Sequence, residues 1–389
     1  MVASSDAGGD SPLIAFAGGG TGGHLYPALA VADALRARLP GVRLLFFATQ
    51  RPLDRRIIGP TDVELIEQPL ASLRRMPWYW PGFLLGFRRS SLVCRKSIAD
   101  LRPSVVVGTG GLGSVPAVRE ASRAGIATAM LNPDAVPGRA NKYLAGKVDI
   151  VFAQWAETAD HFARMSGRKR PRVLITGCPV RTAFNEARRE AGVERFKLAD
   201  GKKTILITGA SQGARNINRA VCANLDLFEH HHREWQIVHL TGESEHEEVV
   251  RAYRGRSVKA VVLRYTEHMA DALAVADLVI GRAGASFLAE ITAVGRAAIL
   301  MPYPYHKDQH QLANARCLEN AGAARIVPDR VDPERNGPAL RAAMEELMAD
   351  AEKRGMMAEA SRRMGRGQAA AAVADHLLTW CGTGVLPVD

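Results

Sequence analysis

Cysteine is scarce in this chain and shows no regular spacing. The 389 residues include five cysteines, and no two of them form a CxxC pair. They are widely scattered, at Cys94, Cys178, Cys222, Cys317 and Cys381. Disulfide frameworks and structural zinc sites both use cysteines at short, regular spacings. The cysteine pattern therefore predicts neither, and it favours a reducing compartment.

Long apolar segments are also missing. No uninterrupted hydrophobic run approaches the roughly 18–20 residues that a membrane-spanning helix needs. The first residues, MVASSDAGGDSP, are polar, whereas a signal peptide has a basic region followed by an apolar one. Aromatic residues make up only 6% of the chain, which argues against an all-β fold. We expect a cytoplasmic protein that does not cross a membrane, although these observations allow it to lie on one.

Acidic residues are outnumbered by basic ones, which gives a formal net charge of +11. A strongly basic protein favours an acidic partner, such as nucleic acid, anionic lipid or a phosphorylated substrate. The net charge does not choose among these partners, and a general surplus of surface arginine is an alternative explanation.

Short apolar segments alternate with helical patterns along the whole chain. The first half opens with an expected strand at residues 13–17, a glycine turn and a helix, and the second half opens in the same way at residues 204–208. This alternation is typical of a parallel sheet covered by helices on both faces. The repeated plan predicts an α/β protein with two facing, Rossmann-like, doubly wound domains. Ligands of such sheets bind beyond the carboxyl ends of the strands, here in a cleft between the domains.

A charged stretch with few large apolar residues, at 185–203, marks the junction between the halves. We expect an N-terminal domain over residues 11–184, a C-terminal domain over residues 200–365, and a C-terminal helix and tail over residues 366–389.

A glycine-rich turn, GGGTGGH at residues 18–24, follows the first strand. Glycine lets backbone N–H groups approach an anion closely, and the next helix presents its positive end there. The turn also satisfies the dinucleotide pattern GxGxxG, but the second strand ends in Thr49 and Gln50 without the acidic residue of that pattern. His24 is a candidate base for a sugar hydroxyl; a capping or packing histidine is the alternative.

Two further turns have similar composition. GASQGAR at residues 209–215 mirrors the first turn, and RAGASFLAE at residues 282–290 places small residues before a helix with Glu290 one turn inside it. A phosphate can reach such a helix start, and the carboxylate can accept hydrogen bonds from a ribose diol. The alternative for Glu290 is compensation of the helix dipole.

Polar side chains with well-defined hydrogen-bonding geometry follow a buried strand at residues 302–315. They suit the recognition of sugar hydroxyls. His306 and His310 stand four residues apart with Asp308 between them, but no third metal ligand is evident, so we expect no metal site. Arg181 follows the last strand of the first half. It can steady a diphosphate, or it is a surface residue of the linker.

Aromatic and basic residues are interleaved between residues 74 and 96. The set comprises Arg74, Arg75, Trp78, Trp80, Phe83, Leu84, Phe87, Arg88 and Arg89. Helices that dock on anionic lipid combine these features, and an ordinary core helix is the alternative. Stacking of nucleic-acid bases needs a wider basic stripe, so we expect no nucleic-acid partner.

Seven motifs in order resemble the MurG family over about residues 13–370. They are GGGTGGH at 18–24, GTGGLGSVP at 108–116, NKYLA at 141–145, GCPVR at 177–181, GASQGARNIN at 209–218, RAGASFLAE at 282–290 and DQHQLANA at 308–315. The resemblance implies the GT-B fold and the transfer of GlcNAc from UDP-GlcNAc to lipid I, which makes lipid II for peptidoglycan. The chain has no Asp-x-Asp sequence, the metal clamp of many sugar-nucleotide enzymes, so we expect an inverting reaction that needs no metal or other cofactor.

The resemblance also implies roles for individual residues. His24 would be the base on the acceptor hydroxyl, and the acceptor side would include Gly20, Thr21, Gly22, Gly23, Asp134 and Asn141. Glu290 would bind the ribose and Thr266 would lie at the uracil. The remaining donor residues would be Arg181, Ser211, Gln212, Gly284, Ala285, Ser286, Phe287, His310 and Gln311. The partners would be UDP-GlcNAc, a polyprenyl-pyrophosphate-linked sugar and the anionic cytoplasmic face of the cell membrane.

The chain departs from the family pattern on the acceptor side. The family commonly has His-Glu-Gln-Asn where this chain has Leu131, Asn132, Pro133 and Asp134, and Leu112 replaces the tyrosine of a GlyGlyTyr element. These departures leave open a related transferase for a different lipid-linked acceptor. A non-catalytic UDP-sugar-binding protein at the membrane surface is another alternative. A UDP-GlcNAc epimerase would need an acid–base set that cannot be identified in this sequence. A dehydrogenase would need an acidic residue after the second strand, and the chain has none there.

Overall fold

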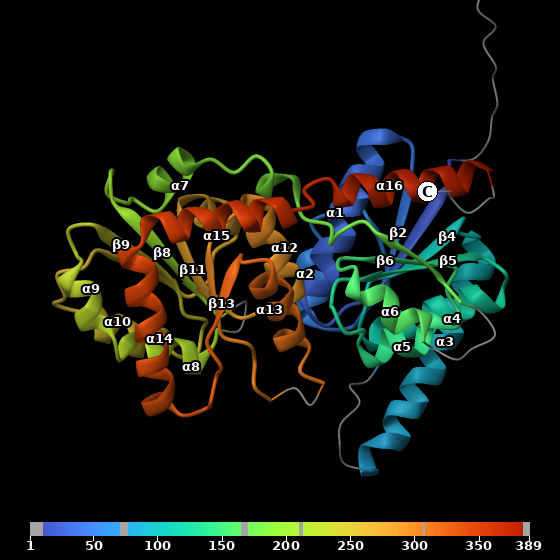
Figure 1. The fold of residues 1–389 in the computed structure, drawn as a ribbon. Helices are drawn as coiled ribbons and strands as arrows, with labels where there is room; N and C mark the ends of the chain where they lie inside the picture. Colours follow the sequence, from blue (N-terminus) through green and yellow to red (C-terminus); the bar gives the residue numbers. More distant parts are fainter. Residues whose placement is uncertain (1–10, 71–76, 165–169, 210–212, 306–307, 384–389) are drawn as a thin grey trace, which may run out of the picture.

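Two parallel β-sheets, each with helices on both faces, lie side by side in the computed structural model (Figure 1). The structure describes residues 11–70, 77–164, 170–209, 213–305 and 308–383. The first sheet has the strand order β3-β2-β1-β4-β5-β6-β7 and the second has the order β10-β9-β8-β11-β12-β13. In each sheet the strand order reverses direction next to its first strand, β1 or β8, so the predicted pair of doubly wound sheets is confirmed.

The first sheet is built from β1 Leu13–Ala17, β2 Arg43–Thr49, β3 Glu64–Gln68, β4 Val105–Gly108, β5 Ala127–Asn132, β6 Ile150–Ala153 and β7 Arg172–Ile175. The second is built from β8 Lys203–Thr208, β9 Trp235–Leu240, β10 Ala260–Leu263, β11 Leu278–Gly281, β12 Ala298–Leu300 and β13 Ala324–Ile326. Every residue of β1 is buried, because helices cover both faces of the sheet. The strands expected at residues 13–17 and 204–208 match β1 and β8 to within one residue, whereas β3 was not expected from the sequence.

The helices of the first half are α1 Gly22–Arg38, α2 Pro52–Ile58, α3 Trp80–Leu101, α4 Val115–Arg123, α5 Arg139–Ala145 and α6 Glu157–Ala163. Those of the second are α7 Arg189–Arg195, α8 Arg215–Cys222, α9 Leu225–His230, α10 His246–Tyr253, α11 Met269–Val275, α12 Ala285–Val294, α13 His310–Asn320, α14 Pro333–Ala349 and α15 Ala351–Met364. Short 3-10 turns are η1 Pro77–Tyr79, η2 Leu112–Ser114 and η3 Thr182–Phe184. The single helix expected after the 209–215 turn is therefore two, α8 and α9.

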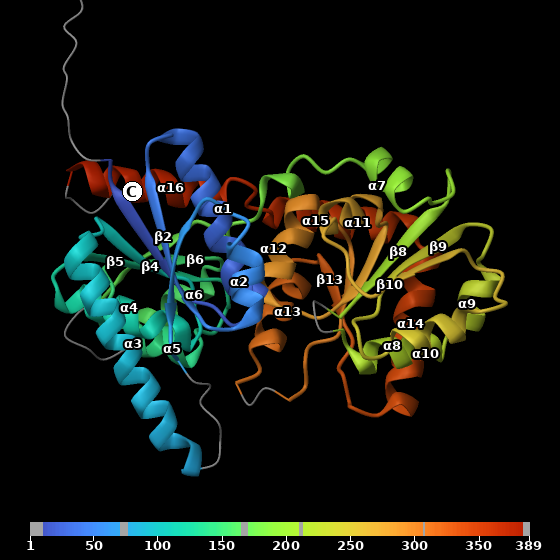
Figure 2. The ribbon, with the colours of Figure 1, turned by 180° about the vertical axis from the view of Figure 1, so that it is seen from behind.

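The last helix, α16 Ala369–Thr383, returns to the first sheet and packs along α1 (Figure 2). Its Val373, Leu377 and Trp380 are part of the first half's core. The chain therefore passes between the halves twice, once after β7 and once after α15. The two passages touch, since the Asn185 side chain donates a hydrogen bond of 2.8 Å to the carbonyl of Gly367.

Candidate functional site

The imidazole of His24 lies in the first turn of α1, over the glycine loop that follows β1. Its Nδ1 atom is 3.2 Å from the carbonyl oxygen of Gly19 and 3.2 Å from Oγ1 of Thr21. A carbonyl oxygen only accepts hydrogen bonds, so Nδ1 is the nitrogen that carries the hydrogen. In the neutral ring, Nε2 is then left with a lone pair that can accept a proton.

The second glycine turn, between β4 and η2, forms the floor under this ring. A Cβ atom on Gly110 would lie 2.8 Å from Cδ2 of His24, and one on Gly111 would lie 3.0 Å from Cε1. Both glycines also have a positive φ, of 109° and 70°. The ring can approach the backbone this closely only because neither residue has a side chain.

The starts of α1 and α12 meet where the two halves face each other. Ser286, in the first turn of α12, donates a hydrogen bond of 3.0 Å to the carbonyl of Gly23. Helix starts carry partial positive charge and free N–H groups. Two such ends within hydrogen-bonding distance of one another favour a diphosphate at this point.

Glu290 and Arg181 face each other across the same junction. Burial raises the pKa of the Glu290 carboxyl to about 7, and the positive charge of Arg181 partly opposes the increase. The guanidinium of Arg181 lies over the rings of Tyr26 and Phe184, at 4.8 and 5.1 Å. Its Nε atom is buried and has no hydrogen-bond partner among the described residues. The pair thus combines an acceptor for a diol with a cation for a phosphate.

His310 and Gln311 open α13 on the second half's side of the junction. Nδ1 of His310 is 2.9 Å from the carbonyl oxygen of Val136, and Nε2 is 3.3 Å from the carboxylate of Asp308. The side-chain oxygen of Gln311 accepts from the backbone N–H groups of Ala283 and Tyr303. That oxygen fixes the turn before α12, while the amide nitrogen keeps its donors for another group.

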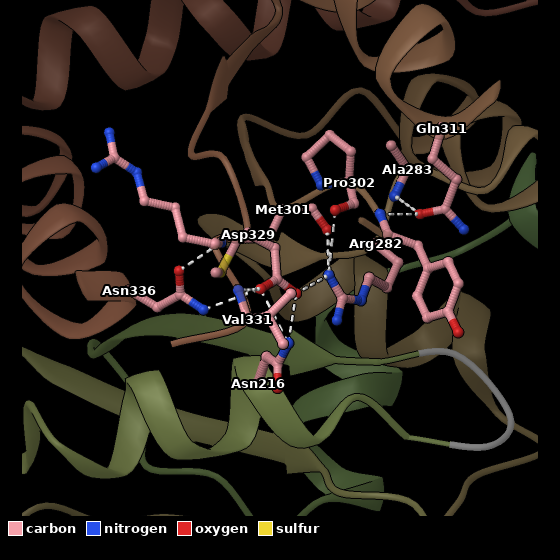
Figure 3. A network of polar contacts seen from close by, with 11 residues as sticks. Asn216, Arg282, Ala283, Met301, Pro302, Gln311, Asp329, Val331 and Asn336 are labelled. Carbon is pink, nitrogen blue, oxygen red and sulfur yellow. Dashed lines mark hydrogen bonds and ion pairs between the residues drawn. The ribbon is translucent and has the colours of Figure 1, made fainter. Parts of the chain in front are cut away.

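Below this turn, a buried ion pair that was not predicted from the sequence supports the start of α12 (Figure 3). Arg282 lies 2.8 Å from the carboxylate of Asp329 and also donates to the carbonyls of Met301 and Pro302. Burial alone would raise the pKa of Asp329, but hydrogen bonds from the backbone of Val331 and from neighbouring side chains lower it. The side chains that donate to this carboxylate are those of Asn216, Arg282 and Asn336.

Asp134 and Asn141, which were predicted to lie on the acceptor side, have different hydrogen-bond partners. Asp134 accepts a hydrogen bond of 2.9 Å from Asn314, which belongs to α13 of the other half. Asn141 is buried, and its amide donates to the side chain of Asn132 and the carbonyl of Leu131. Within the segment 131–134, where the chain departs from the family pattern, Asp134 therefore takes part in the contact between the halves.

Local structure determines the positions of four other residues that were predicted to bind the donor. The Thr266 hydroxyl accepts from the backbone of His268, where α11 begins. Gly284 caps the start of α12, and Ala285 is its first, buried residue. The aromatic ring of Phe287 packs on the backbone of Gly281, where a Cβ atom would lie 2.8 Å from it. Ser211 and Gln212 lie outside the described residues.

Helix α3 projects away from the rest of the molecule (Figure 1). Trp78, Trp80, Leu84, Leu85 and Leu92 have between 50 and 69% of their surface exposed. Arg88 and Arg89 are also exposed, whereas Phe83 and Phe87 are half-buried. The far end of the helix packs through Cys94 and Ile98 into the core. Arg74 and Arg75 lie outside the described residues.

One cavity among the described residues lies elsewhere. It measures about 190 Å³ and is lined by residues of both passages between the halves, including Gly177 and Arg366. None of the predicted site residues lines it. In the part of the chain that is described, no helix is long and apolar enough to cross a bilayer, and no three His, Cys, Asp or Glu side chains are grouped to hold a metal ion.

Comparisons with known proteins give matches in both halves of the chain. Its residues 14–153 match the model of the glycosyltransferase family 28 N-terminal domain, and residues 204–377 match that of the family's C-terminal domain. A relative from Halothermothrix orenii is 39% identical over 91% of this chain and 95% of its own length. It is named UDP-N-acetylglucosamine–N-acetylmuramyl-(pentapeptide) pyrophosphoryl-undecaprenol N-acetylglucosamine transferase.

Solved structures agree with the sequence comparison. The crystal structure of Acinetobacter baumannii MurG is 25% identical, covers 95% of this chain and 100% of its own, and superposes with a TM-score of 0.72. A UDP-N-acetylglucosamine 2-epimerase from Listeria monocytogenes has a TM-score of 0.69 over 97% of this chain and 99% of its own, at 13% identity, so that likeness shows the fold alone. The predicted GT-B fold is confirmed. With both family 28 domains and close relatives over nearly its full length, the chain belongs to the MurG family of glycosyltransferases.

Proposed function

We propose that the protein transfers GlcNAc from UDP-GlcNAc to the 4-hydroxyl of MurNAc in undecaprenyl-pyrophosphoryl-MurNAc-pentapeptide, converting lipid I to lipid II. The names of the relatives state the donor and the lipid-linked acceptor for those proteins. The observation that carries the proposal here is His24, whose Nε2 is free to accept a proton where the starts of α1 and α12 meet.

In the proposed reaction, Nε2 of His24 takes the proton of the acceptor 4-hydroxyl. The hydroxyl oxygen attacks the anomeric carbon of GlcNAc, and the bond from that carbon to the UDP oxygen breaks. Attack from the side opposite UDP inverts the configuration. The start of α12 and the Arg181 guanidinium, which lies near Glu290, would stabilise the negative charge of the leaving diphosphate. We propose that these groups make a metal ion unnecessary.

The donor is proposed to lie along the second half. Glu290 would accept hydrogen bonds from the ribose, and Tyr265 and Thr266 would lie at the uracil. His310 and Gln311 would contact the GlcNAc hydroxyls. Gln311 supports this role because its oxygen is already bound to the backbone of residues 283 and 303. The amide orientation is thereby set before the sugar arrives.

The acceptor is attached to a membrane lipid, so the enzyme is proposed to work on the cytoplasmic face of the cell membrane. The projecting helix α3 would dock there. Its exposed Trp80, Leu84 and Leu85 would enter the headgroup region, and Arg88 and Arg89 would face anionic lipid.

The test is a panel of acceptors with UDP-GlcNAc as donor. UDP release should be fastest with a lipid I analogue, and EDTA should not reduce it. Inhibition by EDTA that added Mg²⁺ reverses would contradict the metal-free mechanism. Turnover with another polyprenyl-linked sugar but not with lipid I would instead favour a different acceptor, the alternative that the sequence departures at residues 131–134 leave open.

A further inference from the structure

A buried carboxylate lies behind the glycine loop, on the side away from His24. It belongs to Asp54 in α2, and the residue has no exposed surface. One oxygen accepts from the backbone N–H of Gly20 at 2.9 Å. The other accepts from the backbone N–H and the hydroxyl of Thr49, at 3.1 and 2.5 Å. The carboxylate therefore joins the glycine loop to the end of β2.

The Gly20 N–H and the Gly19 carbonyl belong to the same peptide group. One end of this group donates to the carboxylate, and the other end accepts from Nδ1 of His24 at 3.2 Å. We propose that Asp54 is a positioning residue for His24, acting through the Gly19–Gly20 peptide. This inference rests on the proposed role of His24 as the base.

The loop needs such a support because its backbone is unusually free to turn. Gly19 and Gly20 both have a positive φ, of 131° and 89°, and two successive glycines let the peptide between them rotate at little cost. If that peptide turned over, its carbonyl would leave Nδ1 and its N–H would face the ring instead. The hydrogen would then favour Nε2, and the ring would lose its free lone pair.

The carboxylate and the loop are shaped for each other. A Cβ atom on Gly19 would lie 2.3 Å from the nearer oxygen of Asp54, so only glycine admits the contact. The negative charge also polarises the peptide, which makes the Gly19 carbonyl a better acceptor. Arg51 steadies the next peptide from outside, with a hydrogen bond of 3.2 Å to the Gly20 carbonyl.

The first test is the tautomer of His24 in the full-length protein, read from ¹⁵N chemical shifts of the imidazole. The wild type should carry its hydrogen on Nδ1, whereas Asp54→Asn should populate the Nε2–H form. Thr49→Val is the matched control, because it removes a bond to the same carboxylate but leaves the Gly20 contact; it should keep the wild-type tautomer. An unchanged tautomer in Asp54→Asn overturns the proposal.

The second test is a double-mutant cycle in the transferase reaction. Asp54→Asn should lower kcat by about 10- to 100-fold, the range found when a hydrogen-bond partner of a metal-bound histidine is lost, with little change in KM for UDP-GlcNAc. In a His24→Ala background the same change should cost nothing more, because its effect passes through the ring. Equal losses in both backgrounds would show a purely structural role and overturn the proposal.

Two further points keep the tests separate. Asp54→Ser is smaller and cannot crowd the loop, so it serves as a second variant with the same expectations should Asp54→Asn fold poorly. The tautomer measurement needs no turnover. If the wild type transfers no GlcNAc to lipid I, the proposed function fails while the spectroscopic result still decides the role of Asp54.

Discussion

At the scale of single residues, the space around His24 is set by glycines rather than by large side chains. Gly110→Ala would place a Cβ atom within 2.8 Å of the ring. We predict a loss in kcat of at least about tenfold, because the ring must move from its position, measured by UDP release. Gly125→Ala is the matched control, since Gly125 also has a positive φ, of 72°, but has open space around it. It should lose about 1 kcal/mol of stability and keep its kcat; an equal loss of kcat in both variants would contradict the prediction.

Glu290 gives the donor site a predicted pH dependence. Because burial raises the pKa of this carboxyl to about 7, it is mostly protonated below that pH and ionised above it. The proposed contact with ribose uses the ionised form as an acceptor, so affinity should rise as pH increases through 7. The dissociation constant of UDP-GlcNAc, measured by calorimetry, should be about tenfold higher near pH 6 than near pH 8. The pH dependence of this dissociation constant should disappear in Glu290→Gln. If it persisted in that variant, another titrating group would be responsible for it.

The sequence was informative about these residues where the chemistry is local. The glycine turns, His24 and Glu290 stand out because each lies within a few residues of a strand end or helix start. Arg282 and Asp329 were missed because they are 47 positions apart, and an arginine after one strand and an aspartate after another are ordinary in a sequence. Asp54 was missed for the same reason: only the fold brings it to Gly20, 34 positions away.

At the scale of secondary-structure elements, α3 is the part whose surface is hardest to explain by packing alone. Leu84→Glu puts a charge on an exposed apolar position that has no packing role. We predict weaker binding to vesicles that contain anionic lipid, by several-fold in sedimentation, with unchanged UDP-GlcNAc affinity. The matched control is Met356→Glu on α15, where the side chain is equally exposed at 61%. Equal effects of the two substitutions would remove α3 as the docking element.

The central strands were easier to predict than the edge strand β3. Central strands such as β4, with four buried residues, read as continuous apolar runs. The edge strand β3, ELIEQ, has only two apolar residues, which are adjacent, and only Gln68 is buried, so its sequence resembles that of a loop. The break between α8 and α9 was missed because no proline or glycine marks it in the sequence.

At the scale of the whole molecule, one buried amide makes hydrogen bonds that join the halves. Asn314 accepts from the backbone of Ala135 at 2.8 Å and donates to Asp134 and to the carbonyl of Ala283. We predict that Asn314→Ala destabilises the protein by about 2–3 kcal/mol, because it leaves the buried Ala135 N–H without a partner. Differential scanning calorimetry would measure this. Asn185→Ala removes an exposed contact between the two passages and should cost less than about 1 kcal/mol; a similar loss in both variants would contradict the assignment.

The return of α16 to the first half shows what the sequence could not predict at this scale. An Ala-rich helical pattern at the end of the chain is visible, but its partner α1 lies more than 300 residues earlier. The same holds for the contact between Ser286 and Gly23, which joins two turns that were predicted separately. Each motif indicated an anion site, and only the fold places them together.

The central claim is that His24 removes the acceptor proton at the meeting point of the two halves. The most direct measurement is a single-turnover assay of GlcNAc transfer to a lipid I analogue, with enzyme in excess, comparing wild type and His24→Ala. We predict a loss of about 10²- to 10⁴-fold in the chemical step, with UDP-GlcNAc affinity unchanged. A variant that transfers GlcNAc at the wild-type rate would contradict the account and require a different base.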